Sequence, residues 1–270
     1  MIGNDRWQGH PCAFVLRVDV EQREAERYTG DPRTERVATL ALLDHLAQVG
    51  VRASCAVLGI TAEHYPDVIR RVAEAGHDVL GHSMFHEPAY GELSLADQRW
   101  DHRRSREAIV DACGVTIRGI AAHYHGLTDE NTYQAAVLED FDYLLGRRPE
   151  GLPDDAPGFA PFQPAGCDRP VLAPAGRRIG ASDWSARRRE WPWIEEPWSA
   201  GGARLKWRAD VARAAGEGAL YTLVVHPWMF AINEGEWPVV RDVIACARDH
   251  GAWMTTFGEL SAHALPPSAA

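Results

Sequence analysis

The feature that most constrains the fold of this chain is the alternation of short apolar runs with segments of helical periodicity. The apolar, β-branched run at 12–20 predicts a buried strand, and helix-like spacing of apolar residues from Glu35 predicts a helix that stops at Gly50. Strands and helices that alternate at this interval are typical of parallel βαβ units, in which helices cover the sheet. Roughly seven or eight such units favour a closed α/β barrel over an open doubly wound sheet.

The expected strands cover residues 12–20, 51–58, 77–80, 119–122, 143–145, 219–225 and 253–256. The expected helices cover residues 35–48, with Thr34 as the cap, and 61–76, 95–112, 130–138, 203–215 and 238–249. The charged segment 21–26 is expected to be a loop. Between about 147 and 200 the alternation gives way to a proline- and tryptophan-rich stretch, which predicts a long functional loop or an insertion.

Length and composition bound the class of protein. The 270 residues are expected to form one catalytic domain, because α/β barrels of this length commonly share a single core. No stretch approaches the roughly 18 apolar residues of a membrane helix, and the net charge of −10 argues against nucleic-acid or membrane partners. The N-terminus lacks an apolar signal core and the cysteines form no CxxC pair, which favours a cytoplasmic location. The oligomeric state stays open, a homo-oligomer included.

Charged or imidazole side chains directly follow three of the expected strands. Asp19 and Glu21 end the first strand at alternate positions, so both point to the same face of an extended chain. His82 and His86 follow the third strand, and His226 follows a late one. Because active sites of parallel α/β folds lie at the carboxyl ends of the strands, these side chains are expected to meet there.

This combination suits a catalytic metal site. Two imidazoles four residues apart, completed by a carboxylate, match a His₂Glu set that leaves positions open for water and substrate. If one carboxylate binds the ion, the other is free to take a proton from metal-bound water, and His226 could protonate a leaving amine. The histidine pair alone is weak evidence, since the spacing occurs on helix faces by chance; the three strand ends together carry the prediction.

The motifs resemble those of the polysaccharide deacetylase family, the NodB-homology or carbohydrate esterase 4 group, over about residues 14–260. Segment 18–21 is similar to the family's first motif and segment 76–86 to its second, which contains HSxxH. Segment 223–227 resembles the fifth motif, a leucine followed by an acid histidine. The resemblance implies a deformed (β/α)7-8 barrel, TIM-like in class, and hydrolysis of N-acetyl groups on amino sugars.

By this resemblance the general base is Asp19, the general acid is His226, and the metal ligands are Glu21, His82 and His86. The ion is expected to be Zn²⁺, with Co²⁺, Mn²⁺, Ni²⁺ and Fe²⁺ as alternatives.

Further residues are expected around the substrate. Asp183 and Trp184 resemble the fourth motif, in which an aspartate orients the acid histidine and a tryptophan lines the acetyl pocket. Trp228 stands beside the acid histidine and is expected to contact substrate. His123 and Tyr124 follow a strand and either line the pocket or are loop residues with satisfied hydrogen bonds.

Two departures from the family pattern stand out. The third motif, whose arginine pairs with the catalytic aspartate, falls on residues 121–124, where alanine stands in place of the arginine. The metal carboxylate is a glutamate, Glu21, rather than an aspartate. Both changes resemble a divergent intracellular branch related to allantoinases and cyclic imidases.

The sequence therefore predicts a metal-dependent hydrolase of C–N bonds other than peptide bonds. An N-deacetylase acting on an acetamido sugar or a small acylamino compound is the first hypothesis, with a small molecule or an oligosaccharide as the partner. The alternatives are a cyclic-amide hydrolase, a non-catalytic glycan- or metabolite-binding barrel, and a non-haem Fe(II) oxygenase built on the same His₂-carboxylate set.

Overall fold

A computed structural model describes residues 7–123, 128–146, 159–160, 166–167, 200–232 and 236–264. Its strands are β1 (Ala13–Val20), β2 (Ser54–Val57), β3 (Asp78–Gly81), β4 (Gly119–Ala121), β5 (Tyr143–Leu145), β6 (Phe159–Ala160), β7 (Gly166–Cys167), β8 (Leu220–Val225) and β9 (Trp253–Thr255). Its helices are α1 (Gln22–Thr29), α2 (Arg33–Val49), α3 (Gly59–His64), α4 (Pro66–Glu74), α5 (Leu95–Cys113), α7 (Glu130–Leu138), α9 (Ala200–Glu217), α10 (Pro227–Ile232), α11 (Glu236–Asp249) and α12 (Phe257–Ala264), with a 3₁₀ turn η2 (Tyr90–Glu92).

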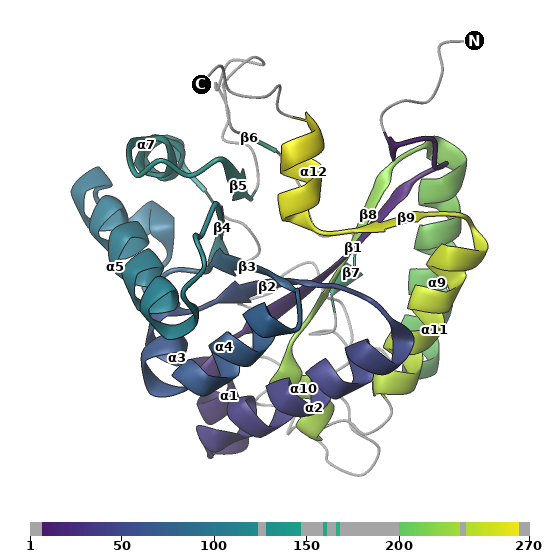
Figure 1. Ribbon diagram of the computed structural model, residues 1–270, viewed down its shortest axis with the longest axis horizontal. Coiled ribbons are helices and arrows are strands. Elements are labelled where there is room, and N and C mark those ends of the chain that lie inside the picture. Colours follow the sequence, from purple (N-terminus) through teal and green to yellow (C-terminus); the bar gives the residue numbers. More distant parts are fainter. Residues whose placement is uncertain are drawn as a thin grey trace.

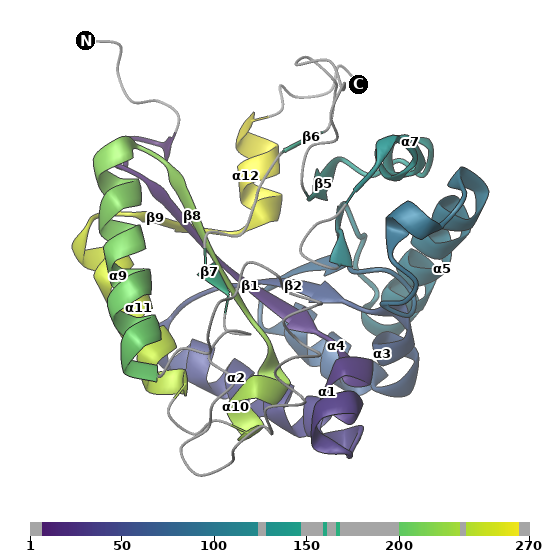
Figure 2. The same cartoon turned by 180° about the vertical axis from the view of Figure 1, so that it is seen from behind.

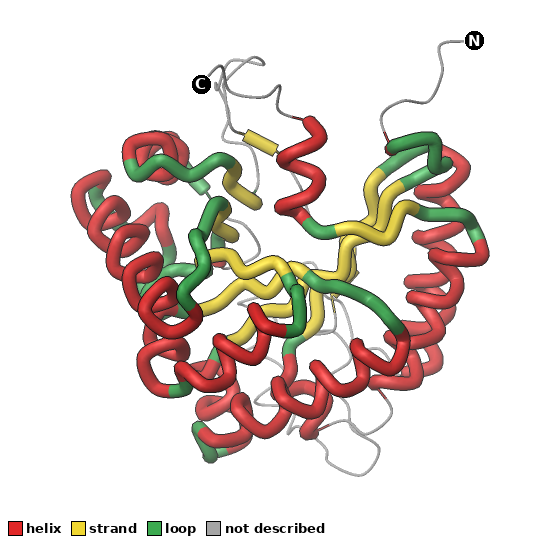
Figure 3. The backbone as a smooth tube through the Cα atoms, in the orientation of Figure 1, coloured by secondary structure: helices red, strands yellow, loops and turns green. Residues whose placement is uncertain are grey.

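The strands form one parallel sheet that curls inside a layer of helices (Figure 1). The strand order is β6-β5-β4-β3-β2-β1-β8-β7, and β9 also pairs with β1. In Figure 3 the strands, drawn in yellow, make a curved layer with most of the helices on its convex side. The view from behind shows α9 and α11 beside β8 (Figure 2). The prediction of a deformed α/β barrel is confirmed, in the form of a curled, partly closed parallel sheet.

Strand β1 is the centre of the sheet. Along one edge it pairs with β8 over residues 13–18. Along the other edge it pairs with β9 over 13–15 and with β2 over 17–20. The sheet therefore divides at this edge, and the first amides of α12 donate to Ser54 Oγ at 2.8 Å and to Asp78 Oδ2 at 2.9 Å, which closes the amino-terminal end of the curl.

The two faces of β1 have different roles, and this alternation places the functional residues. The side chains of Phe14, Leu16, Val18 and Val20 join the apolar cluster between the sheet and the outer helices. Ala13 and Val15 join a smaller cluster on the inner face, together with residues of β2, β3 and β4. Because side chains alternate along a strand, residues 17 and 19 also face the interior of the curl. The first half of that face is apolar, and its carboxyl end is charged.

Three local predictions are wrong, each for a physical reason. The charged segment after β1 is helix α1 rather than a loop, because one side of it, with Gln22, Glu24 and Ala25, is buried while Arg23, Glu26 and Arg27 stay exposed. Thr34 lies inside α2, where its hydroxyl contacts Thr29 Oγ1 at 3.0 Å instead of capping the helix. The helix expected over 61–76 is two helices, because Pro66 cannot donate a backbone hydrogen bond and starts α4 anew.

Most of the irregular stretch predicted for 147–200 lies outside the described residues; β6 and β7 are the parts of it that the structure describes. Among the described helices, none is both long enough and apolar enough to span a bilayer.

Candidate active site

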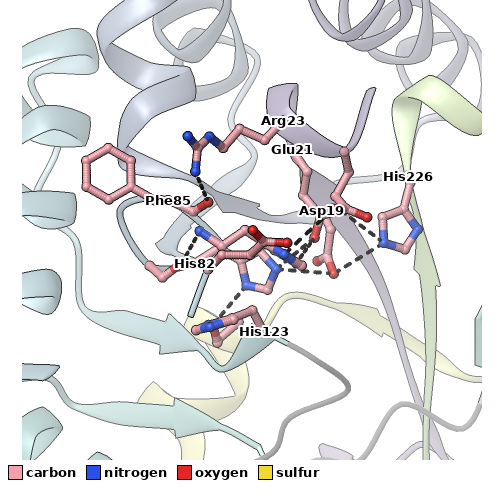
Figure 4. A network of polar contacts seen from close by, with 12 residues as sticks. Asp19, Glu21, Arg23, His82, Phe85, His123 and His226 are labelled. Atoms are coloured by element: carbon pink, nitrogen blue, oxygen red, sulfur yellow. Dashed lines mark hydrogen bonds and ion pairs between the residues drawn. The ribbon is translucent and has the colours of Figure 1, made fainter. Parts of the chain in front are cut away.

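The carboxyl ends of β1, β3 and β8 bring a group of buried polar side chains together inside the curl (Figure 4). Ligand-type atoms of Glu21, His82 and His86 lie within 4.8 Å of one another. A second group with the same spread contains Asp19, Glu21 and His226. All five side chains predicted from the strand ends are thus neighbours, and each is buried. Glu21 belongs to both groups.

The loop that carries the two histidines is held in an unusual backbone conformation. Ser83 and His86 have φ angles of 72° and 69°, in the left-handed region that side chains other than glycine rarely adopt. Met84 N donates to Asp101 Oδ2 at 2.8 Å, and His86 N donates to Ser83 Oγ at 2.9 Å. These bonds offset the cost of the strained residues, which is of order 1–3 kcal/mol each, and fix the direction of the imidazoles.

The start of α3 supports the same loop from the other side. The amides of Gly59 and Ile60 each donate at 3.0 Å, to the carbonyl oxygens of Ser83 and Met84. A Cβ atom at position 59 would lie 2.4 Å from Met84 Sδ and 3.0 Å from Ser105 Cα. The close approach of α3 to the loop therefore requires glycine at this position.

The hydrogen bonds of His82 show what its other nitrogen can do. Nδ1 lies 2.9 Å from the carbonyl oxygen of Ala121, which can only accept, so Nδ1 carries the proton. Nε2 lies 3.0 Å from Glu21 Oε1, and His86 Nε2 lies 3.2 Å from the same oxygen. A neutral His82 thus directs a lone pair at a carboxylate oxygen, which is favourable only with a cation, either a second ring proton or a metal ion, between them.

The spacing of these donors fits a metal ion. For bonds of about 2.0–2.1 Å, two ligands of a tetrahedral Zn²⁺ lie roughly 3.3 Å apart, close to the 3.0 and 3.2 Å separations from Glu21 Oε1 to the two imidazoles. The hydrogen bond from His82 Nδ1 to a backbone carbonyl is the kind of outer contact that orients metal-binding histidines. The residues present fit a divalent ion.

Asp19 has an arginine partner that the motif comparison did not anticipate. Arg17 Nε donates to Asp19 Oδ1 at 2.6 Å, and Arg17 Nη2 donates to Asp19 Oδ2 at 3.0 Å. Both side chains are buried, so this is a two-point, charge-assisted pair. The alanine at position 121 therefore does not leave Asp19 without a guanidinium, because the same strand supplies one. The signal in the sequence was an arginine two residues before the aspartate, on the same face of a buried strand.

His226 reaches the group from β8. Its Nε2 lies 3.7 Å from Asp19 Oδ2 and 3.6 Å from Glu21 Oε2. The indole of Trp228 packs beside it, with ring centroids 5.8 Å apart, and is completely buried. Trp228 thus forms part of the wall behind His226.

His123 lies on the far side of the metal-type ligands. Its Nε2 donates to Pro88 O at 2.9 Å, and its ring centroid lies 5.3 Å from that of His86. Burial, followed by the neighbouring His86 and His82, holds the pKa of His123 well below its usual value. It is therefore a neutral wall residue. Tyr124, Asp183 and Trp184 lie outside the described residues.

Two carboxylates behind the site could not be found from motifs. Glu35 Oε1 on α2 accepts from Glu21 N at 3.0 Å, and burial, followed by the nearby Glu21, raises the pKa of Glu35 well above its usual value. Asp101 on α5 accepts from the histidine loop, as described above. His102, also on α5, is fully buried with its ring centroid 5.0 Å from that of Tyr90. No local pattern marks helical residues that approach a site only through packing.

Comparisons with known proteins agree with this architecture. The polysaccharide deacetylase family model matches residues 30–143. A chitooligosaccharide deacetylase of Rhizobium leguminosarum bv. trifolii is 42% identical over 72 residues, which are 27% of this chain and 33% of that protein. The match therefore spans about a third of that relative's length.

Solved structures cover nearly the whole chain. A protein from Mycobacterium smegmatis assigned to the polysaccharide deacetylases superposes with a TM-score of 0.73 at 22% identity, covering 95% of this chain and 91% of that one. An allantoinase gives a TM-score of 0.73 at 14% identity, covering 96% and 92%. At these identities the likeness shows the fold alone. The family model over residues 30–143 and the curated relative thus agree with the resemblance to the polysaccharide deacetylase (NodB-homology) family, and the solved structures agree with it in fold.

Proposed function

We propose that this protein is a metal-dependent hydrolase of a carbon–nitrogen amide bond, with an acetamido sugar or a similar small acylamino compound as substrate. The observation that carries the proposal is the convergence of Asp19, Glu21, His82, His86 and His226 from three strand ends. A buried set of three imidazoles and two carboxylates costs considerable desolvation, and structural packing alone gives no reason to gather it.

The ligands of the ion in this proposal are Glu21, His82 and His86. A divalent ion held there, with Zn²⁺ the best match to the donor set, would polarise the amide carbonyl and lower the pKa of water. Glu35 holds the backbone of Glu21 in place, and Ala121 O orients the ring of His82. Glu21 and His82 are therefore held in position before the substrate binds.

Two residues move protons. Asp19 accepts a proton from the attacking water, and Arg17 keeps the carboxylate oriented for this role. His226 donates a proton to the departing nitrogen, and Trp228 limits the motion of its ring. A positioned acid or base contributes roughly 10²- to 10⁴-fold, so each of these two residues should be essential for turnover.

The same two proton transfers would serve the opening of a cyclic amide. The solved allantoinase shares the fold, and the third-motif alanine separates this chain from the family's usual pattern. Product identity distinguishes the two substrates, because deacetylation releases acetate and ring opening does not.

The test is an amide panel run on one protein preparation. Metal-free protein is reconstituted with Zn²⁺, Co²⁺ or Mn²⁺ and given chitooligosaccharides, N-acetylglucosamine, simple acetamides and cyclic amides. Acetate release and ring opening are measured for the wild type, Asp19→Asn and His226→Ala. Asp210→Asn is the matched control, since Asp210 is a buried aspartate on α9 that pairs with Lys206 and Arg213 away from the site.

We expect metal-dependent turnover of one substrate class, a loss of about 10²-fold or more in both site variants, and wild-type rates in Asp210→Asn. Near-normal turnover in Asp19→Asn or His226→Ala would contradict the assigned roles. Metal binding without turnover of any amide would favour a binding barrel.

A further inference from the structure

The site contains two sets of possible metal ligands that share Glu21, so a further residue must determine which set binds the ion. Glu21 lies within reach of His82 and His86 on one side and of Asp19 and His226 on the other. An ion could in principle be shared by both carboxylates. We propose that Arg17 excludes Asp19 from the metal's ligand set and thereby keeps Asp19 available as the base. This inference rests on the proposed function.

The geometry of the Arg17–Asp19 pair supports this role. The planar guanidinium engages both carboxylate oxygens, at 2.6 and 3.0 Å, which fixes the plane of the carboxylate as a single bond could not. Each oxygen retains a second lone pair, so Asp19 can still accept a proton. Because the two residues are buried, the pair is not screened by water as a surface pair is.

The two carboxylates are also unequal in their distances to the imidazoles. Glu21 Oε1 lies 3.0 Å from His82 Nε2, whereas Asp19 Oδ2 lies 3.8 Å from the same atom. A rotation about the side chain of Asp19 could close this gap, and the bonds to Arg17 oppose that rotation. The positive charge of Arg17 further reduces the attraction of Asp19 for a second cation.

Removal of the guanidinium should therefore change the metal site as well as the rate. Without Arg17, Asp19 is free to join Glu21, His82 and His86 as an additional ligand. The ion would then be bound more tightly, and the base would be lost. A merely structural role of Arg17 predicts the opposite, namely a looser site with weaker binding.

The experiment compares Co²⁺-substituted proteins by visible absorption, which reports the number and geometry of ligands, and by metal affinity in chelator competition. The variants are Arg17→Met, Arg17→Lys, Asp19→Ala and the double variant Arg17→Met/Asp19→Ala. Arg106→Met is the matched control, because Arg106 is a partly buried arginine stacked over Phe141 at 3.8 Å on helix α5, away from the ligands.

We expect Arg17→Met to shift the Co²⁺ spectrum, to bind metal about tenfold or more tightly, and to lose about 10²-fold in turnover. The spectral shift should be absent when the double variant is compared with Asp19→Ala, since the added ligand is missing from both. Arg17→Lys should shift the spectrum less, because a lysine is a point charge that cannot hold both oxygens. Arg106→Met should match the wild type.

An unchanged spectrum in Arg17→Met, or a shift that persists in the Asp19→Ala background, would overturn the inference. If Arg17→Met does not fold, a wild-type spectrum and turnover in Arg17→Lys overturn it equally. The proposed function fails separately, if Glu21→Ala binds Co²⁺ as tightly as the wild-type protein does.

Discussion

Gly59 offers a direct test of how the histidine loop is held in place. In Gly59→Ala the new Cβ would lie 2.4 Å from Met84 Sδ and 3.0 Å from Ser105 Cα, whereas carbon contacts are comfortable at about 3.5–4.0 Å. Met84 is buried, so its side chain has little room to move away. The loop or α3 must shift by roughly 1 Å to restore ordinary contact distances.

The structure sets the expected magnitude. Overpacking of this kind costs about 1–3 kcal/mol, and each kcal/mol lowers the melting temperature by roughly 2–4 °C in a chain of this size class. Because the displaced segment carries His82 and His86, turnover should fall by more than the reduced stability alone would explain. A misplacement near 1 Å can cost about 10²-fold in rate.

The assay combines thermal unfolding, metal content and turnover on the best substrate of the amide panel. Gly216→Ala is the control, since Gly216 lies in α9 with no atom within 4 Å of an added Cβ. It should be neutral or stabilise the helix by about 0.5–1 kcal/mol. A Gly59→Ala protein with wild-type melting temperature and turnover would refute the proposed link between α3 and the ligand loop.

Three further perturbations have defined outcomes. Glu21→Ala should abolish stoichiometric metal binding in elemental analysis, and retention of a full equivalent would remove Glu21 from the ligand set. Burial raises the pKa of Glu35, so the folded, metal-free protein holds a proton that the unfolded chain releases above about pH 4.3, and stability should fall as pH rises. The free energy of unfolding of Glu35→Gln in urea, taken relative to that of the wild type, should therefore increase from about pH 5 to pH 8. An equal difference at both pH values would contradict this. Asp78→Ala should cost about 2–4 kcal/mol, because Ser54 and Gly258 lose their acceptor, yet leave turnover intact.

The site could be predicted to the extent that its residues follow strands. Asp19 is the penultimate residue of β1, whereas His82 and His226 directly follow β3 and β8, and the carboxyl ends of parallel strands meet at one edge. The sequence therefore determined which side chains gather and, through the alternation along β1, that Asp19 and Glu21 share a face. The alternation of strands and helices likewise determined the curled α/β architecture.

Only the tertiary structure decided how these residues are distributed between roles. The pairing of Arg17 with Asp19, the support of Glu21 by Glu35 and the orientation of His82 by Ala121 depend on strand register and on helix packing. Local sequence periodicity contains no information about which distant segment of the chain will pack beside a given strand or helix. Hydrogen-bond partners of buried groups are set by that placement, because a polar atom removed from water binds whatever donor or acceptor the packed chain provides.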